Sequence, residues 1–383
     1  MFNNIVVSEF NIPYRDTFGK SINFNPSILH LKDNYFLLST HVYKREKDVP
    51  PNTIVHANTN DPYHMYFGGY NSSTWWSEGP NGFRGTAFFI IKIFNHTITV
   101  VKSIAYNHYG VDARLAHTTQ GMVATLTDTT FVDERGSERT HYNLNACVSY
   151  NLEDRTMLLL PINVYVKTAS TIYVNIPEKP GTILCPRLQY LEKNWSLWTY
   201  DNQLYISNYL VPQHIVFVPK YGNYDDCYVI TSDTYSLYEY IERYYDRHVI
   251  FSLSAPAIPY NDLMIGVGHI KITENVSKYT PAYYATQNNR PKHPCQNTTY
   301  MMFLYTFDPE TLEIIESSPA FIPPETEHSV VFPCGFIYFD NNYIISYGEG
   351  DVKMKLMFIP YNNVKNLLRP VDNFTEEYEF IEL

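Results

Sequence analysis

An aspartate and an arginine stand two positions apart in a segment of strand-forming residues, Gly110-Val111-Asp112-Ala113-Arg114-Leu115. Side chains two apart in a strand project to the same face, so we expect Asp112 and Arg114 to share one surface. Burial raises the pKa of such a carboxyl, whereas the guanidinium lowers it. A carboxyl tuned in this way can transfer protons, and a structural ion pair is the alternative. Asp128 ends the strand-like segment that follows.

Other polar residues end apolar segments elsewhere in the chain. Arginine, lysine and histidine donate hydrogen bonds to phosphate, so the basic ones are candidate contacts for an anionic ligand. The candidate ligand-binding residues, in addition to Arg114 and Asp128, are Asn25, Arg187, Lys193, His214, His269, Tyr347, Glu349 and Asp351. The alternative role of each histidine is a buried side chain with satisfied hydrogen bonds. The alternative for Lys193 is an ordinary ion pair in a loop, and the alternative for Glu349 and Asp351 is a cap on a hairpin.

A repeat predicts the elements that position these residues. Three segments share a turn of Asp and Asn followed by an apolar strand ending in Ser, and they begin at Asp33, Asp201 and Asp340. Two weaker copies begin at Gln120 and Asn261. Asp and Asn tolerate the left-handed backbone of tight turns, and apolar runs rich in Tyr, Phe and β-branched residues favour strands. Five copies of one strand unit predict an all-β fold, a five-bladed β-propeller.

The predicted propeller is one domain over residues 1–383, with blades at about 20–110, 111–184, 185–258, 259–315 and 316–365. The innermost strands of a propeller line its central channel, so residues that end those strands are the ones expected to form a site. Residues 235–247 carry Tyr and Ile at helical spacing and are a candidate short helix.

Composition excludes several classes of function. A formal net charge of −11 and a pI near 5.6 argue against a nucleic-acid partner. The first residues lack the pattern of a signal peptide, and no apolar segment has the length of a membrane span, so we expect a cytoplasmic protein without membrane insertion. Five widely spaced cysteines without a CxxC pair predict neither disulfides nor a zinc site. No motif for a bound metal occurs.

Short motifs at the ends of these strands resemble those of five-bladed propeller enzymes that act on glycosides. The first two are Asn25-Pro26-Ser27 and Val111-Asp112-Ala113-Arg114, and weaker similarities follow at residues 191–195, 266–269 and 346–351. The resemblance covers roughly residues 20 to 360 and is closest to glycoside hydrolase family 130, the mannoside phosphorylases, and the related β-mannosyltransferases of glycosyltransferase family 108. It implies that Asp112 is the catalytic acid.

This sequence departs from that pattern at two positions. Ala113 replaces a proline, and Asn25 stands where the related hydrolases keep a carboxylate. Two-carboxylate glycosidases need a base or nucleophile facing the acid, and asparagine is neither. The nucleophile must then arrive already ionised, or attack a donor that has a good leaving group.

We therefore predict a glycosyltransferase-type enzyme that forms a mannoside-like bond in the central pocket. Its donor would be a nucleotide sugar or a sugar phosphate, its partner a carbohydrate acceptor, and it would need no further cofactor. The alternatives are a glycoside phosphorylase, a hydrolase that recruits Glu349 or Asp351 as a distant base, and a carbohydrate-binding propeller without catalysis.

Overall fold

The computed structural model describes residues 4–12, 22–44, 54–57, 65–68, 83–107, 110–118, 121–132, 138–144, 147–151, 156–160, 164–165, 194–211, 213–219, 227–234, 249–273, 298–328, 330–371 and 381–382. Arg187, Lys193 and the candidate helix over 235–247 lie outside this description.

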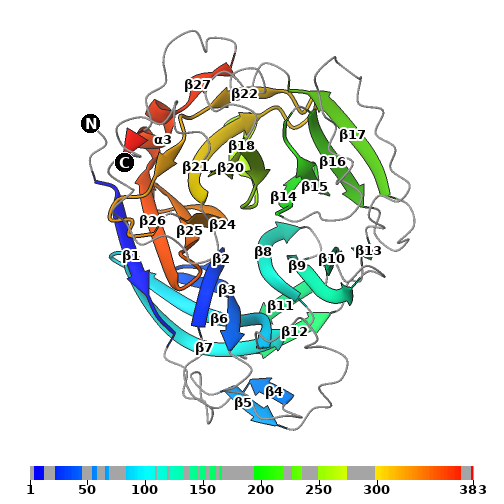
Figure 1. Cartoon of the computed structure of the whole chain (residues 1–383), viewed down its shortest axis with the longest axis vertical. Helices are drawn as coiled ribbons and strands as arrows, with labels where there is room; N and C mark the ends of the chain where they lie inside the picture. Colours follow the sequence, from blue (N-terminus) through cyan, green and yellow to red (C-terminus); the bar gives the residue numbers. More distant parts are fainter. Residues whose placement is uncertain are drawn as a thin grey trace.

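Five sheets, antiparallel except for one short parallel pair at residues 321–322 and 381–382, stand around a central axis, which makes the fold a five-bladed β-propeller, as the repeat predicts (Figure 1). The first sheet has the order β2 (Ile22–Lys32), β3 (Tyr35–Lys44), β6 (Phe83–Phe94), β7 (Thr97–Asn107). A separate hairpin of β4 (Ile54–Ala57) and β5 (Met65–Gly68) is inserted between β3 and β6.

The second and third sheets follow along the chain. The second contains β8 (Gly110–Thr118), β9 (Gly121–Val132), β10 (Glu138–Leu144), β11 (Cys147–Asn151), β12 (Thr156–Leu160) and β13 (Val164–Tyr165). The third has the order β14 (Ser196–Tyr200), β15 (Gln203–Tyr209), β16 (Gln213–Pro219), β17 (Cys227–Asp233).

The fourth sheet begins with β18 (Val249–Leu253), ahead of the boundary near residue 258 that the repeat predicts. Its other strands are β19 (Ile258–Tyr260), β20 (Leu263–Thr273), β21 (Thr298–Phe307), β22 (Ile314–Ser317), β23 (Phe321–Ile322), β27 (Arg369–Pro370) and β28 (Ile381–Glu382). Both β18 and β19 pair with β20, so residues 254–257 interrupt what is otherwise one first strand.

The fifth sheet closes the ring by joining the first described strand to three strands from residues 331–360. It has the order β24 (Val331–Phe339), β25 (Asn342–Glu349), β26 (Lys353–Pro360), β1 (Val6–Phe10), so its outer strand comes from the N-terminus. The helix α3 (Tyr361–Leu367) follows β26. No helix in the described ranges is long and apolar enough to cross a membrane.

The repeated Asp and Asn residues form the turns between the first two strands of the sheets. Asp33, Asp201, Asn261 and Asp340 have φ values of 51°, 45°, 52° and 50°. Short polar side chains accept this left-handed backbone at lower cost than others do. The repeat thus marks the same hairpin in the first, third, fourth and fifth sheets, so the number of its copies predicts the number of blades.

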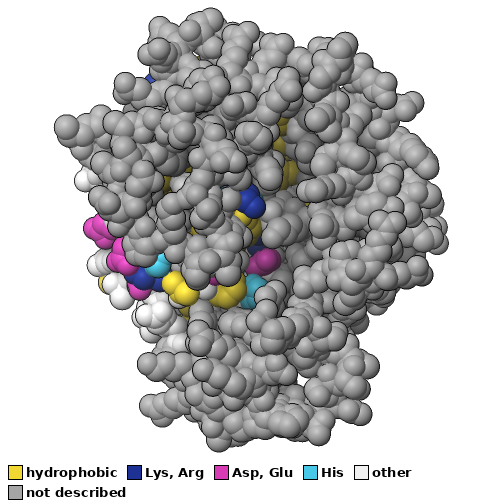
Figure 2. Space-filling view, in the orientation of Figure 1, with side chains coloured by type: hydrophobic (Ala, Val, Ile, Leu, Met, Phe, Trp, Pro, Cys, Tyr) yellow, Lys and Arg dark blue, Asp and Glu magenta, His cyan; other side chains and the backbone are white. Residues whose placement is uncertain are grey.

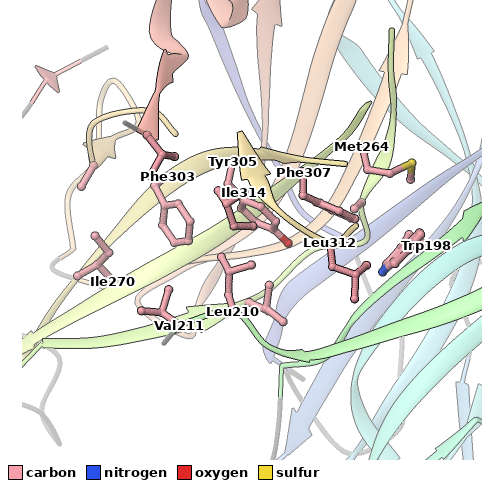
Figure 3. Close-up of a cluster of buried hydrophobic side chains, with 14 of the residues drawn as sticks. Trp198, Leu210, Val211, Met264, Ile270, Phe303, Tyr305, Phe307, Leu312 and Ile314 are labelled. Atoms are coloured by element: carbon pink, nitrogen blue, oxygen red, sulfur yellow. The ribbon is translucent and has the colours of Figure 1, made fainter. Parts of the chain in front are cut away.

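The apolar core lies between neighbouring blades. Trp198 from the third sheet meets the ring of Phe307 from the fourth, with ring centroids 5.1 Å apart, and Phe303 and Tyr305 belong to the same cluster (Figure 3). Similar clusters join the fourth sheet to the fifth, the fifth to the first, and the first to the second. Because the first, fourth and fifth sheets are packed on both faces by these clusters, their first strands, nearest the axis, are well held and can position a site.

Candidate functional site

Two β-bulges re-aim side chains on the first strands of the first and second sheets. The pairing of β2 with β3 shifts register between Phe24 and Ser27, and that of β8 with β9 shifts between Val111 and Arg114. Asn25 and Asp112 lie in these bulges with φ values of 49° and 54°. A bulge bends its strand and turns a side chain out of the regular alternation. Here the two bulges turn Asn25 and Asp112 toward each other.

The Asp112 carboxylate is held through one of its two oxygens. Asn25 Nδ2 donates to Oδ1 over 2.9 Å, and His41 Nδ1 lies 3.1 Å from the same oxygen. Oδ2 makes no hydrogen bond with the described residues. The side chain of Asp112 is 17% exposed and that of His41 is 6% exposed. The carboxylate is therefore fixed on one side and presents its second oxygen.

Charges and donors around Asp112 favour its ionised form. Burial alone raises the pKa of this carboxyl, but the charge and hydrogen bond of His41, the charge of Arg114 and the hydrogen bond from Asn25 lower it. The lowering effects prevail, and the pKa of Asp112 lies well below its ordinary value. In the free protein Asp112 is thus an ionised carboxylate.

Arg114 contacts main-chain carbonyls rather than the Asp112 carboxylate. Its Nη1 donates to the carbonyl of Asp112 over 2.7 Å, and its Nε donates to the carbonyl of Ser254. The guanidinium also lies over the Phe332 ring, 5.3 Å from its centroid. The expectation that Asp112 and Arg114 share a strand face fails because the bulge removes the simple alternation between positions 112 and 114, and the alternative of an ion pair between their side chains is not seen either. Arg114 instead connects β8 to residues 254–257, which interrupt the first strand of the fourth sheet.

Asn25 is wedged between Asp112 and the fifth sheet. A Cβ added to Gly348 would lie 2.2 Å from Asn25 Oδ1 and 2.8 Å from its backbone nitrogen. Glycine is therefore needed at 348 for Asn25 to reach Asp112. Ser346, on the same strand as Gly348, donates a hydrogen bond to the carbonyl of Pro26 over 2.6 Å, and this bond holds the bulge in place.

His269 lies beside Ser254, the residue whose carbonyl holds Arg114. Its Nδ1 lies 2.5 Å from Ser254 Oγ, and the carbonyl of Ser254 accepts from Arg114. The ring stacks on Tyr300 and meets the edge of Phe332. Burial is the main cause that raises the pKa of Tyr300 to about 12. His269 thus supports Ser254, which in turn holds Arg114.

His214 lies away from the axis, on the third strand of its sheet. Its two ring nitrogens lie 2.8 Å from Ser207 Oγ and 3.1 Å from the carbonyl of Leu312, and the side chain is fully buried. Burial lowers the pKa of His214 to about 4. These contacts correspond to the alternative of a satisfied buried histidine, not to an anion contact.

Glu349 is a fully buried carboxylate with structural partners. It accepts hydrogen bonds from the backbone nitrogens of Glu327 and His328 over 2.6 and 2.9 Å, and it pairs with Lys355 over 2.6 Å. These contacts clamp the segment that precedes β24. The Glu349 carboxylate is therefore engaged in structural contacts and does not face the Asp112 carboxylate as a base.

The remaining predicted residues have diverse positions. Tyr347 is fully buried on β25, and burial raises the pKa of its hydroxyl well above the ordinary value. Asp351 is half-buried in the turn after β25 with a φ of 55°. Asp128 lies on β9 opposite Gly110, and its side chain is outside the description. Within the described ranges, no group of three His, Cys, Asp and Glu side chains gathers as a metal site.

His41 is a site residue that sequence reasoning missed. It lies on β3 two positions after Ser39, the serine that ends the first copy of the repeat. That placement is the signal that could have found it, because polar residues at the ends of the repeated strands are the expected site residues. On the face drawn in Figure 2, acidic, basic and histidine side chains come into view near the middle, beside apolar ones.

Comparison with known proteins yields structural matches alone. No family model matches the chain, and no curated sequence does. The β-1,2-mannobiose phosphorylase from Listeria innocua, in complex with β-1,2-mannobiose, superimposes with a TM-score of 0.50 at 12% identity, covering 95% of this chain and 99% of that one. A mannose phosphorylase from Leishmania mexicana, in complex with a phosphate ion, has a TM-score of 0.45 at 12% identity, covering 92% and 89%.

The first of these matches spans nearly the whole of both chains, and at this identity it establishes the fold alone. It confirms the predicted five-bladed architecture and the structural likeness to mannoside phosphorylases. This chain therefore has the five-bladed β-propeller fold of the β-1,2-mannobiose phosphorylase from Listeria innocua.

Proposed function

We propose that this protein is a carbohydrate-active enzyme that transfers a glycosyl group between phosphate and a sugar hydroxyl, with Asp112 as the catalytic carboxylate. The observation that carries the proposal is the Asp112 carboxylate, which is ionised and held through Oδ1, while Oδ2 makes no hydrogen bond with the described part of the chain. The phosphorylases with which the chain shares its fold supply the substrate class, a mannoside.

Phosphate is favoured over water as the nucleophile because a second carboxylate is missing from the described surroundings of Asp112. Asn25 donates to Asp112, so it acts neither as a base nor as a nucleophile. Glu349 is occupied by two backbone nitrogens and Lys355. Asp351 is the remaining candidate for the base of a hydrolase. Phosphate needs no such base, since it arrives as an anion.

The ionised state of Asp112 fits the direction that builds a glycoside. Oδ2 takes the proton of the acceptor hydroxyl while that oxygen bonds to the anomeric carbon of the donor. The bond between the anomeric carbon and the phosphate oxygen breaks, and phosphate leaves with the electron pair. In the reverse direction Asp112 must first bind a proton, which it gives to the glycosidic oxygen as phosphate attacks. Arg187 and Lys193 stay predictions for the phosphate contacts.

The direct test measures phosphate release from mannose 1-phosphate with mannose as the acceptor, and sugar release from β-1,2-mannobiose with and without phosphate. We expect turnover that depends on phosphate in the second reaction. Equal turnover without phosphate would replace the proposal by a hydrolase.

The other readings give different results in the same panel. Product from a nucleotide sugar and none from the sugar phosphate would favour the glycosyltransferase. Thermal stabilisation by glycans, without product from any donor, would favour a carbohydrate-binding propeller, since a ligand that binds only the native state raises its apparent stability.

A further inference from the structure

We infer that His41 is a positioning residue for Asp112: together with Asn25 it fixes Oδ1 and so leaves Oδ2 as the oxygen that meets the substrate. The inference rests on the proposed function, and it adds a residue that the resemblance to glycoside-active propellers did not supply.

The geometry of the two donors carries the inference. His41 Nδ1 reaches Oδ1 from β3 over 3.1 Å, and Asn25 Nδ2 reaches the same atom from β2 over 2.9 Å. Two donors on one oxygen remove the freedom of the carboxylate to exchange its oxygens by rotation. The His41 ring is itself held, because it packs on Phe24 with ring centroids 4.2 Å apart.

The hydrogen bonds of the ring nitrogens differ between His41 and the structural histidine His214. His41 Nε2 is buried and makes no hydrogen bond with the described residues. In contrast, both ring nitrogens of His214 have partners. Within the described ranges, the Asp112 carboxylate is thus the hydrogen-bond partner that orients the His41 ring.

The other charged and titratable groups around Asp112 make a different contribution. Arg114, on the same strand, donates to main-chain carbonyls. Cys334, on β24, is buried, and burial raises the pKa of its thiol to about 12, so it is neutral. Among the described residues, His41 is thus the titratable group that directly contacts the carboxylate.

The test compares His41→Asn and His41→Leu with the wild type. Asparagine keeps a donor near the position of Nδ1 without a charge, whereas leucine removes the donor. His117→Asn is the matched control, because His117 lies on β8 and contacts the carbonyl of His30 instead of Asp112. We expect kcat/KM for glycoside synthesis to fall about 100-fold in His41→Leu, less in His41→Asn, and not in the control.

The pH profile separates positioning from general stability. Asp112 must be ionised to act as a base, so a rise in its pKa moves the acid limb of kcat/KM to higher pH. Loss of an opposite charge at this distance corresponds to a move of about one to three pH units. The move is expected in both His41 variants and not in His117→Asn.

A second readout is independent of activity. The carboxyl ¹³C resonance of Asp112, assigned by its absence in Asp112→Asn, is followed through a pH titration in each variant. A titration that moves to higher pH in His41→Leu supports the inference, and an unchanged titration overturns it. Absence of turnover in the wild type with every donor would refute the proposed function, while the carboxyl titration would still decide the role of His41.

Discussion

The substitution Gly348→Ala tests whether Asn25 must stay where it is for the site to work. The new Cβ would lie 2.2 Å from Asn25 Oδ1, 2.8 Å from Asn25 N and 3.3 Å from Asn25 Cα. An ordinary contact requires Asn25 to retreat by roughly 1 Å. Rotation of the side chain alone does not relieve the clash, because the backbone nitrogen is also too close. The bulge that carries Asn25 must therefore shift.

Such a shift breaks the 2.9 Å hydrogen bond from Asn25 to Asp112 and frees the carboxylate to turn. A misplacement of this size costs about 100-fold in rate, and the overpacking destabilises the fold by about 1–3 kcal/mol. The assay is kcat/KM for phosphate release from mannose 1-phosphate with an acceptor, measured beside thermal unfolding.

The matched control is Gly266→Ala in the fourth sheet, where the new Cβ would lie 2.4 Å from the ring of Tyr305. We expect a similar loss of stability there with kcat/KM retained. Wild-type kcat/KM in Gly348→Ala would refute the claim that Asn25 positions Asp112. Equal losses of kcat/KM in both variants would show that overpacking alone is responsible.

Two further predictions concern stability. Glu349→Gln breaks a buried pair with Lys355 and should lower the free energy of unfolding by about 3–5 kcal/mol. Glu327→Gln breaks an exposed pair with Lys353 and should lower it by less than about 1 kcal/mol. Similar losses for the two variants in chemical denaturation would contradict the structural role of Glu349. The pKa of His214 falls from 6.5 unfolded to about 4 folded, so the unfolded state binds a proton first as the pH drops. The stability from the neutral ring, about 3 kcal/mol, is present above pH 6.5 and is lost toward pH 4. His214→Phe should flatten this part of the pH dependence of unfolding, and an unchanged slope would rule His214 out as its cause.

The blade repeat could be predicted because its signal is local. The turn at Asp33 joins two strands that are neighbours in sequence, and the same holds at Asp201 and Asp340. Residue chemistry alone is enough to specify such a hairpin. Asp112 was found from another local signal, its spacing to Arg114 in a segment of strand-forming residues.

The arrangement around Asp112 could not be predicted because it depends on bulges and on distant contacts. Alternation predicts that Asp112 and Arg114 share a face, but the register shift between them cancels it. The carbonyl that holds Arg114 belongs to Ser254, in another blade. His41 is 71 positions from Asp112, and no local pattern joins the two.

The central claim is that the Asp112 carboxylate carries out the proton transfer, and the most direct measurement is turnover by Asp112→Asn beside the wild type. The substrate pair is mannose 1-phosphate and mannose, and circular dichroism monitors the fold. Asparagine retains the size of the side chain but cannot accept the proton. We predict that the wild type releases phosphate and that the rate falls by at least about 100-fold in the folded variant. A folded Asp112→Asn variant that works at the wild-type rate would contradict the claim.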